Sequence, residues 1–431
     1  MKDLRQRGPA GLNTLDVGSA VARLAAGEIT SEALVADCLK RIAARDTDLC
    51  AWAFIDPELA LIQARQCDGE TPRGPLHGVP VGIKDILDTK DMPTEYGSVI
   101  HRGHRPVSDT RCVTALRNAG AVILGKTVTT EFASPVPIGV RNPHDFGRSP
   151  GVSSSGSAAA VADYMVPVAL GTQTGGSVIL PAAFCGVFGF KGSLNAIDRG
   201  GIRHLRPSLD TLGFMTRSAE DMAIIYGALT ASTVTPGDQP QSPRIGICRT
   251  PWWDSAAPET DTAIETAERK LANIGAEVAR VELPEVFANA EETFRVISSV
   301  EGVSALEEEL ANQFDVMNHW IKAGAEACLS WSDSDLQAAQ THAEKCRSVL
   351  GGIFDEFDVI LTASTVGEAT EDLVGISDSC FNRIWTMMHG PCVTIPAYSG
   401  PNGMPVGIQV VGRPGDDANV IEIAGWITRH L

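Results

Sequence analysis

The spacing of apolar residues changes near residue 79. Before that point, residues 14–27 and 31–45 carry apolar side chains at helical spacing, and Ser31 is a suitable N-cap for the second helix. We therefore expect an N-terminal helical layer within residues 1–70. After that point, short apolar runs bounded by Gly and Pro indicate buried strands. These runs occupy residues 79–83, 121–124, 165–170 and 187–190.

Predicted helices at residues 109–119 and 157–162 separate these strands, and the alternation favours an α/β fold. Such a fold has a central mixed, twisted β-sheet with helices on both faces. A further strand is expected at 245–248 and a helix at about 260–274. The strand pattern then returns at 358–362, 392–396 and 405–412, and an apolar helix follows from about residue 416. Because the sheet is completed so late, we expect residues 1–431 to form a single large domain.

Residues 285–352 differ from the rest of the chain. Helix-forming, acidic and amide residues dominate this stretch, and strand signals are few. We therefore expect an additional, largely helical cap within residues 235–355.

Composition and charge narrow the classes of function. The chain has 431 residues, of which 44% are hydrophobic and 20% charged, as in a folded globular protein. Its formal charge of −18 opposes a grip on phosphates, so we expect no nucleic acid partner. No run approaches the roughly 20 apolar residues of a membrane helix, and residues 1–12 lack the apolar core of a secretory signal. We therefore expect a cytoplasmic protein without a membrane partner. The ten cysteines form no C-x-x-C pair or Cys/His cluster, and we expect no metal site.

Two segments rich in Gly and Ser, residues 151–157 and 172–177, lie close together, and Lys84 ends an apolar run upstream. Such segments are usually plain loops, but here long apolar runs hold them between buried elements. Glycines before Ser177 let backbone N–H groups approach a substrate oxygen, as acyl transfer requires. Lys84 either reaches solvent from a strand end or is buried. To act as a base at neutral pH it must lose about 3 units of pKa, roughly 4 kcal/mol, which burial can supply.

Residues 120–127, Gly-Ala-Val-Ile-Leu-Gly-Lys-Thr, match the phosphate-loop pattern letter for letter. The four intervening residues are apolar and are typical of a strand, whereas a phosphate loop follows its strand. We therefore reject nucleotide binding at this segment.

The chain resembles the amidase signature family in several motifs that occur in the right order. These motifs are residues 151–193, Gly74-Pro-Leu-His-Gly-Val-Pro-Val-Gly-Ile-Lys84-Asp85, Gly125-Lys126-Thr127 and Pro405-Val-Gly-Ile-Gln409. The resemblance covers most of the chain except about residues 235–355, which we regard as the variable region. It implies the amidase signature fold, with Ser177 as the nucleophile and Lys84 as the base. Ser153, in a cis peptide bond, is implied as the proton shuttle between them.

The resemblance also implies a reaction. Neutral Lys84 takes a proton through Ser153, Ser177 attacks an amide carbonyl, ammonia or an amine leaves, and water hydrolyses the acyl-enzyme to a carboxylate. The backbone N–H groups of the oxyanion hole would come from Thr174, Gly175, Gly176 and Ser177. No cofactor is implied. The expected substrate is a small-molecule carboxamide, or a related carbamate or urea-type compound.

The sequence departs from the family pattern beside the proposed serines. Gln173 stands where many members have Asp, and Ile179 and Leu180 stand where an Arg is common, so a charged pair near the nucleophile is missing. Val152 replaces a usual Gly next to Ser153. These changes are either a harmless exchange of an ion pair for apolar contacts or a loss of loop support that lowers activity.

Candidate substrate-binding residues are mostly apolar or aromatic, and ordinary core packing is the alternative for each of them. The candidates are Met92, Tyr96, Thr130, Trp320, Phe381 and Trp385. The oligomeric state stays open, a homo-oligomer included. Two other functions also stay open: an amidotransferase-type subunit that acts in a complex, and a noncatalytic binding protein on the amidase scaffold.

Overall fold

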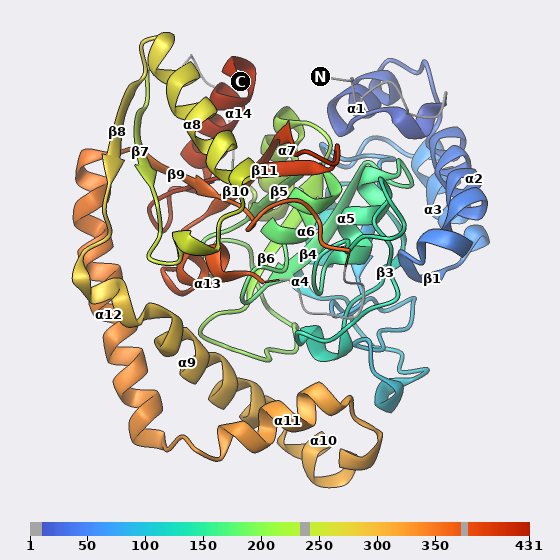
Figure 1. Ribbon diagram of the computed structural model, residues 1–431. Coiled ribbons are helices and arrows are strands. Elements are labelled where there is room, and N and C mark those ends of the chain that lie inside the picture. The colour runs from blue at the N-terminus through green and yellow to red at the C-terminus, as the bar shows by residue number, and fades with distance from the viewer. Residues whose placement is uncertain (1–10, 233–241, 372–377) are drawn as a thin grey trace.

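A mixed sheet of 11 strands forms the centre of the protein, as the alternating pattern predicted (Figure 1). The computed structural model describes residues 11–232, 242–371 and 378–431. The strands lie in the spatial order β1-β3-β2-β4-β6-β5-β10-β11-β9-β7-β8. Their bounds are β1 (Trp52–Ile55), β2 (Pro80–Lys84), β3 (Val122–Thr127), β4 (Val168–Gln173), β5 (Phe188–Lys191), β6 (Thr211–Thr216), β7 (Arg244–Cys248), β8 (Glu277–Val281), β9 (Val359–Ala363), β10 (Cys392–Ser399) and β11 (Pro405–Val411).

The pairing of the central strands brings the candidate motifs to one edge of the sheet. β2 lies between β3 and β4 and is parallel to both, with Ile83 opposite Leu170 of β4. The carboxyl ends of parallel neighbours meet at the same edge. β4 then pairs antiparallel with β6, with Gln173 opposite Thr211. β2 and β3 are buried along their whole length, which explains their continuous apolar runs.

Helices flank the sheet and confirm the predicted layered architecture (Figure 1). α5 and α6 pack on each other and on the middle strands, whereas α7 packs on α4 and α14. The helices are α1 (Val17–Ala25), α2 (Ser31–Leu49), α3 (Pro57–Gly69), α4 (Arg111–Asn118), α5 (Ser155–Ala162), α6 (Ile179–Cys185), α7 (Ala219–Thr230), α8 (Pro258–Asn273), α9 (Ala290–Ala305), α10 (Glu307–Asn312), α11 (His319–Cys328), α12 (Asp333–Glu356), α13 (Cys380–Met387) and α14 (Asp417–His430).

A helical arm made of α9 to α12 extends below the sheet in Figure 1. α12 packs along α9, and α11 and α10 also contact α9. We call these four helices the cap. Residues 244–281 of the variable region are not part of it, because they contribute β7, α8 and β8 to one side of the sheet.

Two local predictions are resolved by the structure. The N-cap of α2 is Thr30, whose hydroxyl accepts the Ala33 N–H, and not Ser31, which is buried and donates to the carbonyl oxygen of Gly78. The phosphate-loop match was rightly rejected. Gly125 and Lys126 lie inside β3, and the Lys126 side chain is fully buried there.

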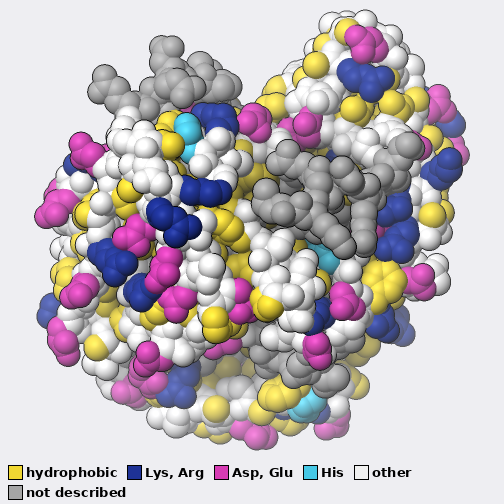
Figure 2. Space-filling view, turned by 45° about the horizontal axis from the view of Figure 1, so that its top comes forward, with side chains coloured by type: hydrophobic (Ala, Val, Ile, Leu, Met, Phe, Trp, Pro, Cys, Tyr) yellow, Lys and Arg dark blue, Asp and Glu magenta, His cyan; other side chains and the backbone are white. Residues whose placement is uncertain are grey.

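The surface carries charges of both signs. On the face shown in Figure 2, acidic and basic side chains are interspersed among apolar and neutral ones. None of the described helices is long and apolar enough to cross a membrane. Residues 1–10, which bear on the expected lack of a secretory signal, lie outside the described residues.

Candidate active site

Lys84 is the last residue of β2, and its side chain points at the neighbouring end of β4. Its ammonium group donates to Ser153 Oγ at 2.7 Å and to Thr172 Oγ1 at 2.8 Å. The side chain is fully buried. Burial lowers the pKa of Lys84 from 10.5 to about 7, and the negative charge of Asp210 opposes this change. Lys84 is therefore partly deprotonated near neutral pH.

Ser153 lies in the turn before α5, held against β4 by its neighbours. The Ser154 hydroxyl donates to the carbonyl oxygen of Thr172 at 3.1 Å, and the Ser157 hydroxyl donates to that of Leu170 at 2.8 Å. The expected cis peptide bond is wrong, because every described peptide bond is trans. The chain turns instead at Gly151, whose φ of +112° suits glycine and whose Cβ, if present, would lie 2.6 Å from Pro181 Cα.

Ser177 lies in the turn between β4 and α6, directly after Gly175 and Gly176. It is 9% exposed, and within the described residues its hydroxyl forms no hydrogen bond, so none joins it to Ser153. The backbone N–H groups of Gly175, Gly176 and Ser177 also have no acceptor in the described part of the chain. Three unpaired N–H groups beside a serine hydroxyl are the arrangement that an oxyanion hole requires.

Close packing against α13 explains why the loop before Ser177 contains glycine. A Cβ on Gly176 would lie 2.7 Å from Ser379 Cβ, which is closer than real Cβ atoms come to other atoms. A Cβ on Gly175 would lie 3.4 Å from Ser379 Oγ, which is ordinary contact. The space beside Ser379 therefore requires glycine at position 176.

Gln173 replaces the usual acidic residue with a neutral cap of α6. Its Oε1 accepts the N–H groups of Val178 at 2.9 Å and Ile179 at 3.0 Å, and its Nε2 donates to Thr386 Oγ1 at 3.0 Å. Both polar atoms of this buried amide have partners, so the missing charge leaves no unpaired group behind.

The two other departures from the family pattern contact one another. Leu180 is fully buried in a small apolar cluster with Phe184, Ala369 and Met404, and Val152 packs against this cluster. Leu180, in place of an Arg, and Val152, in place of a Gly, thus pack in the same apolar cluster. This arrangement favours the harmless exchange over a loss of loop support.

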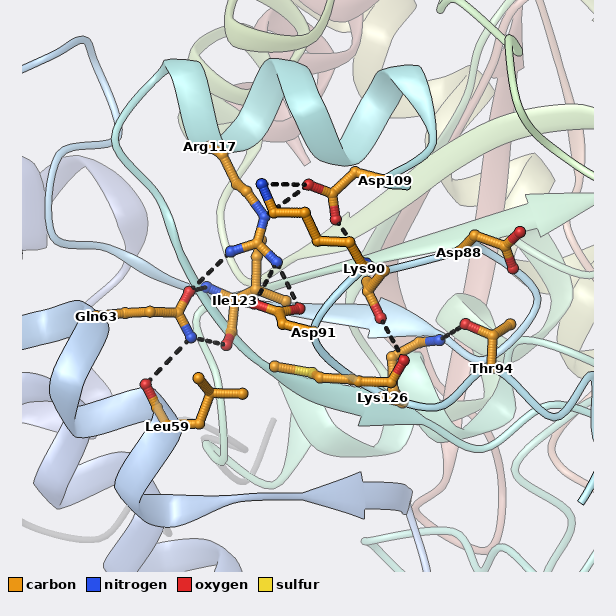
Figure 3. A network of polar contacts seen from close by, with 12 residues as sticks. Leu59, Gln63, Asp88, Lys90, Asp91, Thr94, Asp109, Arg117, Ile123 and Lys126 are labelled. Carbon is orange, nitrogen blue, oxygen red and sulfur yellow. Dashed lines mark hydrogen bonds and ion pairs between the residues drawn. The ribbon is translucent and has the colours of Figure 1, made fainter. Parts of the chain in front are cut away.

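A polar network fixes the loop that follows Lys84 (Figure 3). Asp85 pairs with buried Lys126 at 3.0 Å, and Lys126 also donates to Thr94 Oγ1 at 2.5 Å. Further along the loop, Arg117 of α4 bridges Asp91 at 2.7 Å and Asp109 at 3.1 Å. Because Asp85 is adjacent to Lys84, this network also restrains the end of β2.

The candidate substrate residues do not converge on one surface. Met92, Phe381 and Trp385 are buried in the core, so core packing accounts for them. Tyr96 is nearly buried, and its hydroxyl donates to Asp88 at 2.9 Å. Trp320 is 44% exposed on α11, and its ring lies tilted against that of His319.

Thr130 is the remaining candidate, and like Trp385 it has a buried polar atom without a partner among the described residues. It is 2% exposed, and its hydroxyl has no partner among the described residues. It lies just before a short 3-10 turn at Glu131–Ala133. No group of three or more His, Cys, Asp or Glu side chains suited to a metal ion occurs in the described ranges.

Thr172 is the residue of this site whose role the sequence did not reveal. Its hydroxyl and carbonyl oxygens both accept from Lys84, the latter at 3.3 Å. Thr172 is the first residue of the glycine- and serine-rich segment 172–177, which the sequence pattern did indicate. Its contact with Lys84 depends on the register between β2 and β4, and local composition does not encode that register.

Comparisons with known proteins identify the family to which the chain belongs. The sequence profile described as Amidase matches residues 33–421. One subunit of the glutamyl-tRNA(Gln) amidotransferase of Chloroflexus aggregans is 31% identical, over 97% of this chain and 98% of that protein. A crystal structure of an amidase superposes with a TM-score of 0.89 at 29% identity, over 97% of this chain and 100% of that one. Native peptide amidase from Stenotrophomonas maltophilia superposes with a TM-score of 0.82 at 29% identity, over 97% of both chains. The chain therefore belongs to the amidase family, in which the amidase signature motifs occur.

Proposed function

We propose that this protein hydrolyses a carboxamide or related C–N bond through Ser177, Ser153 and Lys84. One observation carries the proposal: a fully buried lysine with a pKa of about 7 lies 2.7 Å from Ser153 Oγ. A lysine in this state is half deprotonated near neutral pH and serves as a general base. Family membership supports chemistry at a C–N bond, and the departures at Gln173 and Leu180 leave no unpaired charge that speaks against it.

In the proposed reaction, Ser153 and Lys84 first take a proton from Ser177 and then return it to the leaving nitrogen. The Nζ lone pair of neutral Lys84 accepts the Ser153 proton, Ser153 accepts the Ser177 proton, and Ser177 Oγ forms a bond to the substrate carbonyl carbon. The unpaired N–H groups of residues 175–177 donate to the developing oxyanion. The proton returns through Ser153 to the leaving nitrogen as the C–N bond breaks. Water then attacks the acyl-enzyme and releases a carboxylate.

Substitutions at the proposed catalytic residues, with a matched control, test this proposal. We expect a fluorophosphonate to label Ser177, and a panel of aliphatic amides, aryl amides, ureas and carbamates to give ammonia or amine. Ser177→Ala and Lys84→Ala should each lower kcat/KM by about 10³-fold or more. Ser155→Ala is the control, because the buried Ser155 hydroxyl has no partner within the described residues. Full activity in Ser177→Ala would overturn the proposal, and failure to label folded protein would favour a noncatalytic scaffold.

A second candidate is a subunit that supplies ammonia within an amidotransferase. The relative from Chloroflexus aggregans favours it, because the 31% identity extends over nearly the whole of both chains. The two functions differ in what the chain does alone. Turnover of simple amides by the purified chain supports the independent hydrolase. Glutamine hydrolysis that begins only when partner subunits are added supports the amidotransferase.

A further inference from the structure

Asp210 connects the oxyanion loop, residues 174–177, to the segment that precedes β6. The antiparallel register explains the contact, because Gln173 lies opposite Thr211, and the next residues outward are Thr174 and Asp210. Thr174 Oγ1 donates to Asp210 Oδ1 at 2.5 Å. The other carboxylate oxygen accepts the N–H groups of Leu205 and Arg206, each at 2.8 Å. Both oxygens of the carboxylate are therefore occupied.

The charges around Asp210 come from several elements. Arg199 donates to the Asp210 carbonyl oxygen at 2.6 Å. The Arg206 and His204 side chains also interact electrostatically with Asp210, and Glu301 of α9 acts in turn on Arg199 and Arg206. Toward Lys84, the two charged groups bind neighbouring residues at the end of β4, Lys84 through Thr172 and Asp210 through Thr174, and the negative charge of Asp210 favours the ammonium form of Lys84. The carboxylate thus binds both the cationic loop and the end of β4 that holds Lys84.

We propose that Asp210 is a positioning residue that fixes the oxyanion loop through Thr174 and stabilises the ammonium form of Lys84 during catalysis. This inference rests on the proposed function. When Ser177 loses its proton, Lys84 becomes positively charged in a buried place, where a nearby negative charge is most effective. The hydrogen bond between Thr174 and Asp210 holds the carboxylate at the end of β4. It also fixes Thr174, which is the first residue of the oxyanion loop.

Asp210→Asn removes the charge and keeps the contacts. The amide oxygen can accept the N–H groups of Leu205 and Arg206, and the amide nitrogen can donate to the Thr174 hydroxyl, which then acts as acceptor. Thr174→Val does the opposite, because it removes the hydroxyl and keeps the charge. The two variants therefore separate the electrostatic role from the positioning role. Asp198→Asn is the control for charge, since Asp198 lies in the same segment and its carboxylate accepts the N–H of Gly200.

The experiment measures the rate of fluorophosphonate labelling at Ser177 from about pH 5 to about pH 9, which requires no known substrate. We expect the acid limb of Asp210→Asn to move to lower pH, by on the order of half a unit. Thr174→Val should keep the wild-type midpoint and lose about tenfold in plateau rate, and Thr174→Ser should restore it. Asp198→Asn should match the wild type. A merely structural role would lower the rates of Asp210→Asn without moving the midpoint.

The outcomes are distinguishable from failure of the proposed function. If wild-type Ser177 is not labelled, the proposed function fails. If the wild type is labelled and folded Asp210→Asn has an unchanged midpoint, the electrostatic role of Asp210 is overturned. If Asp210→Asn does not fold, the Thr174 pair still decides the positioning role, and a wild-type plateau in Thr174→Val overturns it.

Discussion

At the scale of single residues, Lys84 shows how a cost to the fold becomes a property of the site. A fully buried ammonium loses its hydration, and the resulting fall of its pKa to about 7 lowers the stability of the fold. The hydrogen bonds to Ser153 and Thr172 recover part of that cost. The lysine that we propose as the base is therefore a residue that weakens the fold.

Replacing Lys84 by Met should abolish activity and stabilise the protein. Since the pKa of Lys84 is lower in the folded state than in the unfolded chain, the unfolded chain binds more protons between about pH 7 and about pH 10. Wild-type stability therefore rises with pH across that window, whereas Lys84→Met lacks this contribution. We expect a gain of about 1–3 kcal/mol at pH 6 that shrinks toward pH 9, after the loss of two hydrogen bonds is counted. Urea unfolding at both pH values measures it, and a gain independent of pH would contradict it.

The residues of the site were predictable to different degrees. Lys84, Ser153 and Ser177 stand in sequence motifs, and the structure places Lys84 beside Ser153. The trans peptide at Ser153 and the role of Thr172 were not predictable. The cis bond was expected from the family resemblance alone. The contact of Thr172 with Lys84 depends on the register of two strands, which a local pattern does not contain.

At the scale of elements, the oxyanion loop is shaped by a helix that comes some two hundred residues later in the chain. Ser379, at the start of α13, packs against Gly176, and Thr386 of the same helix accepts a hydrogen bond from the Gln173 side chain. The sequence showed the glycines but not their neighbour. It also missed β6, in which Gly213 lies opposite Lys191 of β5. A Cβ there would collide with the carbonyl oxygen of Phe190.

Two alanine substitutions should show how far close packing against α13 fixes the oxyanion loop. Gly176→Ala places a Cβ 2.7 Å from Ser379 Cβ, so either α13 or the loop must shift. We expect kcat to fall by about 10²-fold or more, since displaced N–H groups no longer meet the oxyanion. Gly175→Ala meets only ordinary contact at 3.4 Å and should lose about tenfold or less. Steady-state kinetics with a substrate from the amide panel compares the two, and equal losses would show that α13 does not constrain the loop.

At the scale of the whole molecule, polar contacts join the cap to the core. Arg203 pairs with Glu309 of α10 at 2.6 Å, and His101 Nε2 lies 3.0 Å from the same carboxylate. Glu131 accepts the N–H of Asn318 at 3.0 Å. The acidic, helix-forming composition of residues 285–352 predicted the cap. It did not predict where the cap attaches, because the partners come from loops in the first half of the chain.

The attachment through Glu309 should make the cap loosen before the sheet. Burial alone would raise the pKa of Glu309, but its bonds to Arg203 and His101 outweigh burial and lower it. A lowered carboxyl pKa contributes stability above the unfolded value, and this contribution is lost as pH falls through the folded value. We therefore expect acid to release the cap, and Glu309→Gln to release it already at neutral pH. Hydrogen exchange should then quicken in α10 and α11 while β4 stays protected. Glu308→Gln, at the exposed neighbouring position, should behave as wild type. If cap and sheet lose protection together in Glu309→Gln, the cap is an integral part of the cooperative core.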